Sequence, residues 1–343
     1  MMRTTVILFA FMLMFLVGCQ ESNEVVEVQR PRISMTFSGL PHLGEGEGNY
    51  ELWAKFVIFD RSGESDSPQH DSTAVSLGEF NISQDGKSVV GLDGGPAQFS
   101  IPVDQNPQLI DIVFITIQQP DSDLAKVTHG EQGPAILGGN VVGDAIVGVA
   151  DLDIAHTDAL GSSFSNVTGK LTITAPTSPA DSNSGVWFIE EQSDTPSVGL
   201  KNLPHLPEGW VYEGWVGFPQ VVIVPGKIAS FGYFSTGKFI RPDSADFDGA
   251  GPGKGAGAVW NFPGEDYINA YAGGPPSRPD LRYSGFMITI EPEPDNSPAP
   301  FPLTILSTQP TSTPLPQGQA LAMSNVAASS SPRARVTIVR SGY

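Results

Sequence analysis

Three aspartates in the second half of the sequence could bind a cation. Asp243, Asp246 and Asp248 precede Gly249, and alternating carboxylates followed by a glycine turn supply the oxygen ligands that Ca²⁺ prefers. The stretch lacks the full loop signature of a calcium site. Two interpretations stay open, a calcium-binding loop and a solvated acidic loop, and the solvated loop is the default. We expect no other cofactor.

Two histidines occupy equivalent places in a repeated segment. His42 and His205 each lie in a Leu-Pro-His-Leu sequence ahead of a strand-like run. Imidazole titrates closest to neutral pH, so a paired metal or acid–base role is one interpretation. Because one ligand per copy does not make a metal site, we favour a ring that caps a turn.

We expect no catalytic residues. The Gly-x-Ser-x-Gly pattern, the full phosphate-binding loop and His-Glu-x-x-His do not occur in the sequence. The acids Glu190 and Glu191 are adjacent, and neighbouring side chains on a strand point to opposite faces, so they do not flank one glycosidic bond. A hydrolase would need activity that disappears when one named acid is changed.

The single cysteine, Cys19, closes an apolar N-terminal run. Arg3 gives this run a positive start, and Val6–Val17 is too short to span a bilayer comfortably. Leu16-Val17-Gly18-Cys19 resembles the lipobox of bacterial lipoproteins. This resemblance implies that the signal peptide 1–18 is removed and that Cys19 is acylated, with chains such as palmitate. The alternative is an ordinary secretory signal with an incidental cysteine.

Composition excludes several classes of protein. The 18 basic and 37 acidic residues give a net charge of −19, which repels nucleic-acid phosphates and anionic headgroups. The 38 glycines and 30 prolines favour turns over long helices, so we expect an all-β protein. With its one cysteine acylated, the chain has no disulfide, and its domains depend on apolar burial.

One module occurs twice along the chain, which predicts two similar domains. Alternating apolar residues predict strands with one buried face, so each module is expected to be an Ig-like β-sandwich whose centre is filled by Trp53 or Trp215. Glycines are expected to form its tight turns at 44–48, 85–86 and 93–94. The landmarks, first copy before second, are Gly39–Leu43 with Asn202–Leu206, Tyr50–Phe56 with Tyr212–Phe218, Leu77–Phe80 with Phe231–Phe234, and Phe114–Pro120 with Met287–Pro294.

These modules predict two tandem Ig-like sandwiches behind the signal peptide. Further strands are expected at 146–149 and 170–174, and a linker at 176–184. After 306 the composition becomes rich in Ser, Thr and Pro, which predicts a loose tail apart from a strand at 334–339. The expected divisions are signal peptide 1–18, acidic tether 19–30, first sandwich with extra strands 31–178, second sandwich 179–307 and tail 308–343.

The repeated motifs resemble the C-terminal extracytoplasmic domain of anti-sigma-K factors. The second copy is the better match, because the run Glu291–Pro300 is similar to that domain's final strand and exit loop. The first copy departs from the frame at Gln118-Gln119-Pro120 and at its ending, Gly133–Gly138. An anti-sigma factor also needs a cytoplasmic sigma-binding segment and a transmembrane helix, and the sequence shows neither. The resemblance therefore implies the sensor-side fold, not sigma binding.

From these features we expect a non-catalytic binding or envelope-interaction module. It would be held by the lipid on Cys19 at the extracytoplasmic side of a bacterial membrane, either at the outer membrane or at a periplasmic face. Its partner would be an envelope protein or a glycan. The alternative is an accessory regulator of envelope-stress signalling related to anti-sigma factors. Four tryptophans in the second copy are either core residues or a binding platform, namely Trp187, Trp210, Trp215 and Trp260.

Overall fold

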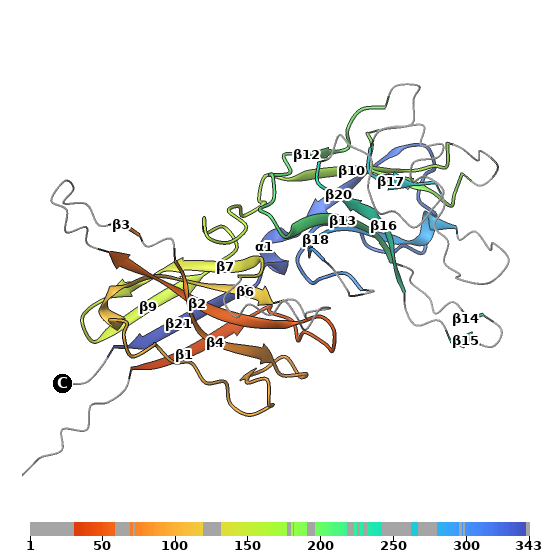
Figure 1. Ribbon diagram of the computed structural model, residues 1–343. Helices are drawn as coiled ribbons and strands as arrows, with labels where there is room; N and C mark the ends of the chain where they lie inside the picture. The colour runs from red at the N-terminus through yellow and green to blue at the C-terminus, as the bar shows by residue number, and fades with distance from the viewer. Residues whose placement is uncertain are drawn as a thin grey trace, which may run out of the picture.

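The computed structural model folds into two antiparallel β-sandwiches placed end to end (Figure 1). This confirms the all-β prediction. No helix in the part of the chain that the structure describes is long and apolar enough to cross a membrane. The described residues are 31–58, 69–70, 73–118, 132–176, 180, 182–190, 196–217, 223–224, 227–228, 232–241, 262–266, 280–294, 297 and 299–340.

The first sandwich packs a four-stranded sheet against a six-stranded one. A short 3-10 helix, η1 (Pro107–Leu109), leads into the second of these sheets. The four-stranded sheet has the order β1 (Arg32–Ser38), β21 (Arg333–Val339), β9 (Val147–Leu152), β8 (Val142–Gly143). The six-stranded sheet has the order β5 (Val89–Val90), β4 (Val75–Ile82), β2 (Asn49–Ile58), β6 (Ile110–Gln118), β7 (Ala135–Asn140), with β3 (Gln69–His70) paired to β2.

The second sandwich is formed by one continuous nine-stranded sheet that folds over itself. A two-stranded hairpin, β14 (Ile223–Val224) and β15 (Lys227–Ile228), and the 3-10 helix η3 (Leu281–Tyr283) lie in its connections. The strand order is β16 (Tyr233–Phe239), β13 (Trp210–Gly217), β18 (Gly285–Pro292), β19 (Thr304–Ser307), β20 (Ala320–Asn325), β10 (Thr168–Ile173), β11 (Val186–Trp187), β17 (Gly264–Glu265), with β12 (Leu200–Lys201) paired to β10.

Strand pairing corrects the expected division of the chain. Strand β10, expected in the first sandwich, pairs with β20, β11 and β12 of the second. The stretch 176–184 is therefore not a linker between sandwiches, because it lies between β10 and β11, which pair with each other. The tail is not loose either: β20 belongs to the second sandwich, and β21 pairs with β1 and β9 of the first. The second sandwich is thus inserted between β9 and β21.

Alternation along β2 shows how the sequence forms this core. Tyr50, Leu52, Ala54 and Phe56 are buried in the main hydrophobic cluster, whereas the residues between them face the other side of the sheet. The main cluster contains residues of both sandwiches.

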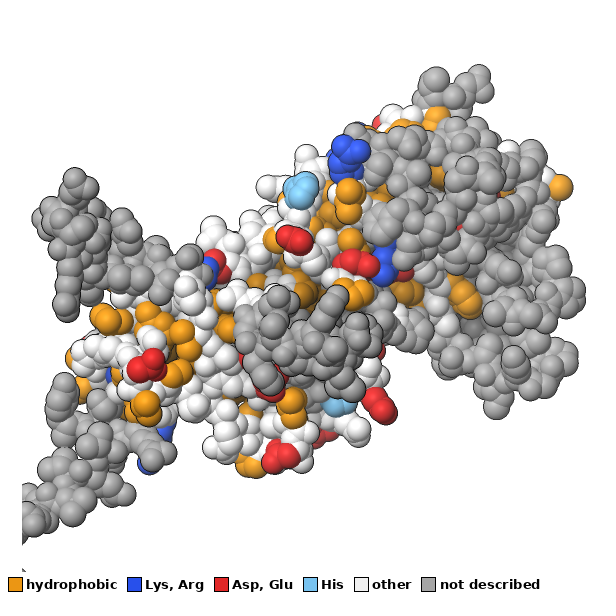
Figure 2. All heavy atoms as spheres, viewed as in Figure 1, with side chains coloured by type: hydrophobic (Ala, Val, Ile, Leu, Met, Phe, Trp, Pro, Cys, Tyr) orange, Lys and Arg blue, Asp and Glu red, His pale blue; other side chains and the backbone are white. Residues whose placement is uncertain are grey.

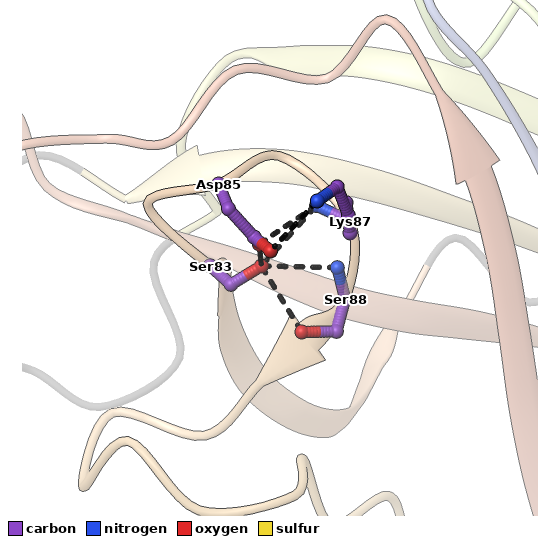
Figure 3. A network of polar contacts seen from close by, with 4 residues as sticks. All are labelled: Ser83, Asp85, Lys87 and Ser88. Carbon is purple, nitrogen blue, oxygen red and sulfur yellow. Dashed lines mark hydrogen bonds and ion pairs between the residues drawn. The ribbon is translucent and has the colours of Figure 1, made fainter.

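The expected glycine turns are confirmed. Gly46, Gly86 and Gly94 have positive φ values of 87°, 71° and 81°, a conformation that glycine adopts without steric cost. In the turn after β4, Ser83 Oγ donates to Asp85 Oδ1 at 2.7 Å, and the backbone N–H of Lys87 donates to the same oxygen at 3.2 Å (Figure 3). The hydrogen bond from Ser83 is the main reason that the pKa of Asp85 lies below its ordinary value.

Asn325 joins the two segments by which the chain crosses between the sandwiches. Its Nδ2 donates to the carbonyl oxygens of Phe164 and Val167 at 2.9 and 2.8 Å, in the segment that leads to β10. Its Oδ1 accepts from Ala327 N at 3.1 Å, at the start of the short helix α1 (Ala327–Ser330), which leads back to β21. One side chain therefore holds both crossings together.

Candidate binding groove

The two copies of the repeated motif use the same tyrosine anchor. Tyr50 stacks on Phe80 at a centroid distance of 5.3 Å and an interplanar angle of 24°, and its hydroxyl donates to Pro41 O at 3.1 Å. Tyr212 stacks on Phe239 at 5.6 Å and 24°, and donates to Pro204 O at 2.7 Å. Burial raises the pKa of both hydroxyls well above the ordinary value, so they remain neutral donors. The tyrosine ties each Leu-Pro-His-Leu segment to its sheet.

The two glycine-containing landmarks are aligned differently from the sequence prediction. In both copies the pairing register shifts by one residue just before the tryptophan of the central strand. The neighbouring strand therefore contains one extra residue, Leu77 in the first copy and Thr236 in the second, and each forms a β-bulge. The glycines that follow, Gly78 and Gly237, have φ values of 144° and 115°. Phe239, not Phe234, is therefore the counterpart of Phe80. The expected match with 231–234 is wrong because it aligned aromatic residues instead of the bulge glycine.

Both tryptophans are buried, but they do not fill the sandwich centres. Trp53 and Trp215 are 2% and 3% exposed. Each tryptophan comes three residues after the inward-facing tyrosine of its strand. Side chains three positions apart on a strand face opposite sides, so both tryptophans lie on the outer side of their sheets. Trp53 belongs to a separate small cluster with Ile112 and Phe114. Each indole N–H donates to a threonine of the neighbouring strand, at 2.9 Å and 2.8 Å. Tyr50 and Tyr212 occupy the central places predicted for the tryptophans.

The other tryptophans of the second copy that the structure describes are core residues. Trp187 is 1% exposed and donates through Nε1 to Asp266 Oδ1 at 2.8 Å. Trp210 is also buried, and its Nε1 donates to Ala135 O of the first sandwich at 3.1 Å. Trp260 lies outside the described residues. Burial of these rings favours packing over an exposed sugar platform.

Each repeat sheet has a buried glutamate at the same position of its outer face, and the two glutamates have different neighbours. Glu51 accepts hydrogen bonds from Ser76 Oγ and from Gln118 Nε2. Its counterpart Glu213, also buried, lies opposite Lys238, whose Nζ is 3.0 Å from Glu293 Oε2. In both copies the carboxylate is buried within the sheet.

The repeated histidines belong to different sandwiches. His42 is exposed, and its Nδ1 lies 2.6 Å from the carbonyl oxygen of Ile82, so the ring fastens the Leu-Pro-His-Leu segment to the end of β4. His205 is exposed in the second sandwich. The described residues contain no cluster of three His, Cys, Asp or Glu side chains that could hold a metal ion. Cys19 and the aspartates 243, 246 and 248 lie outside the described residues, so their predicted roles stay predictions.

A groove lies where the two copies meet. The first copy contributes Pro41, His42 and Leu43, and the second contributes the strand end and exit loop around Glu291 and Phe301. Its volume is about 190 Å³. The apolar lining residues are Pro41, Leu43, Ile117, Pro292, Ala299, Pro300, Phe301 and Pro302.

The acidic groups of this groove are held in fixed positions. Glu291 is fully buried, and both of its carboxylate oxygens accept from Phe301 N at 3.0 Å. Glu47 accepts from Gly44 N at 2.7 Å. The Phe301 ring packs edge-on against Trp210 at 6.2 Å. The lining segments are the Leu-Pro-His-Leu repeat and the proline-rich exit loop, and both can be recognised in the sequence. The groove was missed because the sequence does not show that these two segments lie next to each other.

Comparison with known proteins gives no relative from which a function could be transferred: no family model, no curated protein and no solved structure matches this chain.

Proposed function

We propose that this chain is a lipid-anchored extracytoplasmic binding module, without catalytic residues, that holds a segment of an envelope protein in the groove between its two repeats. The observation that carries the proposal is the groove itself. The Leu-Pro-His-Leu segment of the first copy lines one side, and the exit loop of the second copy lines the other. The anchor rests on the lipobox resemblance at Cys19.

The size and lining of the groove favour a peptide over a small ligand or a sugar. Small-molecule pockets occupy roughly 300 to 1,000 Å³, with a few convergent polar groups. This groove, of about 190 Å³, has room for only a few side chains and is lined mainly by apolar residues, four of which are prolines. Such a surface suits an extended apolar segment.

Charge favours a partner segment that carries a basic residue. The charged or titratable side chains of the described lining are Glu47, Glu291 and His42, with no lysine or arginine among them. The whole chain carries a net charge of −19. Glu291 is buried beneath the groove, so Glu47 and the net negative charge of the chain are what attract a cationic group and disfavour an acidic one.

Blocking the groove tests this function. Ala299 lies in the groove and is exposed, so Ala299→Arg should fill the groove and place a positive charge there without removing core packing. Ala322→Arg, at an exposed site on β20, is the matched control. Cross-linking in the native envelope followed by mass spectrometry should recover the same partner with wild type and Ala322→Arg, and lose it with Ala299→Arg. Equal recovery with all three would contradict a partner in this groove.

The anchor has its own test. Cys19→Ala should give soluble or uncleaved protein, because no acyl group can be attached without the sulfur. Membrane retention of a fully processed Cys19→Ala protein would contradict the lipid anchor.

The resemblance to anti-sigma-K factors supports a second candidate, an accessory regulator of envelope-stress signalling. It rests on the sequence motifs from Leu-Pro-His-Leu to Ile-Thr-Ile-Glu-Pro. Deleting the protein should then change transcription of an envelope-stress regulon even when the groove variant Ala299→Arg does not.

A further inference from the structure

The chain enters and leaves the first sandwich at the same end. Arg32, at the start of β1, pairs with Val339, at the end of β21. This end points away from the second sandwich (Figure 1). We name it the tether end, because residues 19–30 connect it to Cys19.

Exposed aliphatic side chains gather at the tether end. Val142 and Ile146 belong to the hairpin of β8 and β9, and their exposed fractions are 66% and 57%. Val339 pairs with Val147 of the same hairpin and is 36% exposed. Val103 is fully exposed in the turn before η1, which leads to the start of β6 at this end.

Elsewhere, exposed large apolar residues in the described part of the chain are scattered. They are Leu92, Tyr233, Ile240 and Tyr283. Single exposed apolar residues need no explanation, whereas a group at one end marks an interaction surface. Figure 2 shows hydrophobic side chains gathered at the end of the first sandwich that points away from the second.

The hairpin turn holds Ile146 outward in a fixed position. Asp144 Oδ1 accepts from the backbone N–H groups of Ile146 and Val147, both at 2.8 Å. Arg340 N donates to Ile146 O at 2.7 Å, and Arg340 Nη1 donates to Asp144 O at 2.7 Å. Because the backbone is fixed on both sides, the isoleucine remains exposed as part of the folded structure.

Charges at this end are mixed. Arg32 is exposed and Arg340 is buried, while Asp104 and Asp144 lie near Val103 and Ile146. A surface with both signs has little attraction for an anionic headgroup. Aliphatic side chains enter the boundary between headgroups and acyl chains without needing such attraction.

We propose that the tether end lies against the lipid bilayer, with Val103, Val142, Ile146 and Val339 in its interfacial layer. This inference rests on the proposed anchoring through Cys19. Residues 19–30 reach at most about 40 Å when extended, so the anchor keeps this end close to the membrane. The second sandwich then projects away from the bilayer.

A site-specific fluorescent probe tests this orientation. In the acylated protein Cys19 is blocked, so Ile146→Cys supplies one reactive thiol for an environment-sensitive dye. Leu92→Cys, at the other end of the first sandwich, is the matched control, because Leu92 is similarly exposed at 56%. In phosphatidylcholine vesicles, the dye at 146 should shift to the blue and be quenched by a lipid-phase nitroxide. The dye at 92 should be quenched by aqueous iodide.

Two controls separate the possible failures. Val339→Cys reports on the neighbouring strand and replaces Ile146→Cys if that variant does not fold. Mass spectrometry of the N-terminal peptide establishes acylation independently of the dye. An acylated, vesicle-bound protein whose dyes at 146 and 339 behave like the one at 92 would overturn the orientation and leave the anchor intact. A chain without acyl groups that does not bind vesicles would overturn both.

Discussion

The first sandwich completes its sheet with a strand from the end of the chain, whereas the second uses strands that lie between residues 168 and 325. Both nevertheless keep the same stacked tyrosine and phenylalanine, the same tryptophan-to-threonine hydrogen bond and the same bulge. The repeated residues thus specify a local three-strand frame. How each sandwich is closed depends on residues outside the repeat.

The inner positions of the two frames differ where their packing differs. Leu52 of the first copy corresponds to Gly214 of the second. A Cβ at Gly214 would lie 2.8 Å from Cε2 of Phe188 and would clash with Thr236 Oγ1. The Phe188 ring therefore packs against the backbone at Gly214, at the position where the first copy has the buried side chain of Leu52. The two copies thus share the strand register and differ in the side chains that fill the core at this position.

Removing β21 should have the largest effect. This strand lies between β1 and β9 and buries Ala334, Val336 and Ile338. A chain ending at Pro332 should lose the folded first sandwich, because β1 would have no neighbour in its sheet. A chain ending at Arg340 is the matched control. Two-dimensional NMR should show collapsed dispersion for first-sandwich residues only in the shorter chain, and unchanged dispersion there would disprove the closure by β21.

Tyr50→Ala and Tyr212→Ala should be similarly destabilising, each by roughly 3 to 5 kcal/mol, because each deletes a fully buried aromatic ring and leaves a cavity. Tyr→Phe at either site should cost about 1 kcal/mol, for the lost hydrogen bond to proline. Urea unfolding measures both series. A large cost at one site and a small one at the other would show that the two frames are not energetically equivalent.

Asn325→Ala should loosen the junction with a cost of about 1 kcal/mol, since its hydrogen bonds are partly exposed to solvent. The readout is hydrogen exchange of the amides in residues 162–168 and 326–332, which should become faster while exchange in β2 and β13 does not change. The control is Asn106→Ala, which removes a single hydrogen bond from Gln108 N at the start of η1. Equally fast exchange at the junction in both variants would contradict a special role for Asn325.

Acid should weaken one exposed ion pair in each sandwich. Hydrogen bonds from Lys201, Ser197 and Lys170 lower the pKa of Glu190 to about 2 from 4.5. A depressed folded-state pKa gives stability that is present above pH 4.5 and is lost as the pH falls toward 2. Glu190→Gln should flatten this part of the stability profile.

In the first sandwich the matching ion pair is that of Asp151, whose pKa is lowered by the hydrogen bond from Arg335. Asp151→Asn should flatten the acid limb in the same direction. Thermal melts between pH 2 and 7 measure both variants, and an unchanged acid limb in both would show that these surface pairs contribute nothing to pH dependence.

Strands are easier to predict from this sequence than their partners. Alternation in 334–339 indicates a half-buried strand, but alternation does not encode which sheet accepts it, so its pairing with β1 is out of reach. Strand β10 is wrongly grouped with its neighbours in sequence for the same reason. The prediction of tryptophan at the sandwich centre relied on the size of its side chain and was wrong. Tyr50 and Leu52 face inward, so alternation along the strand already places Trp53 on the outer side. The groove requires a segment near residue 42 to meet one near residue 300, which no local pattern shows.

Insertion of the second sandwich into the first is tested most directly by two fragments. The fragment 162–330 contains β10 and the other strands that the structure describes in the second sandwich, whereas 181–330 lacks β10, which pairs with β20, β11 and β12. Calorimetry should show one cooperative unfolding transition for 162–330 and none for 181–330. A cooperative transition of 181–330 that matches that of the longer fragment would contradict this topology.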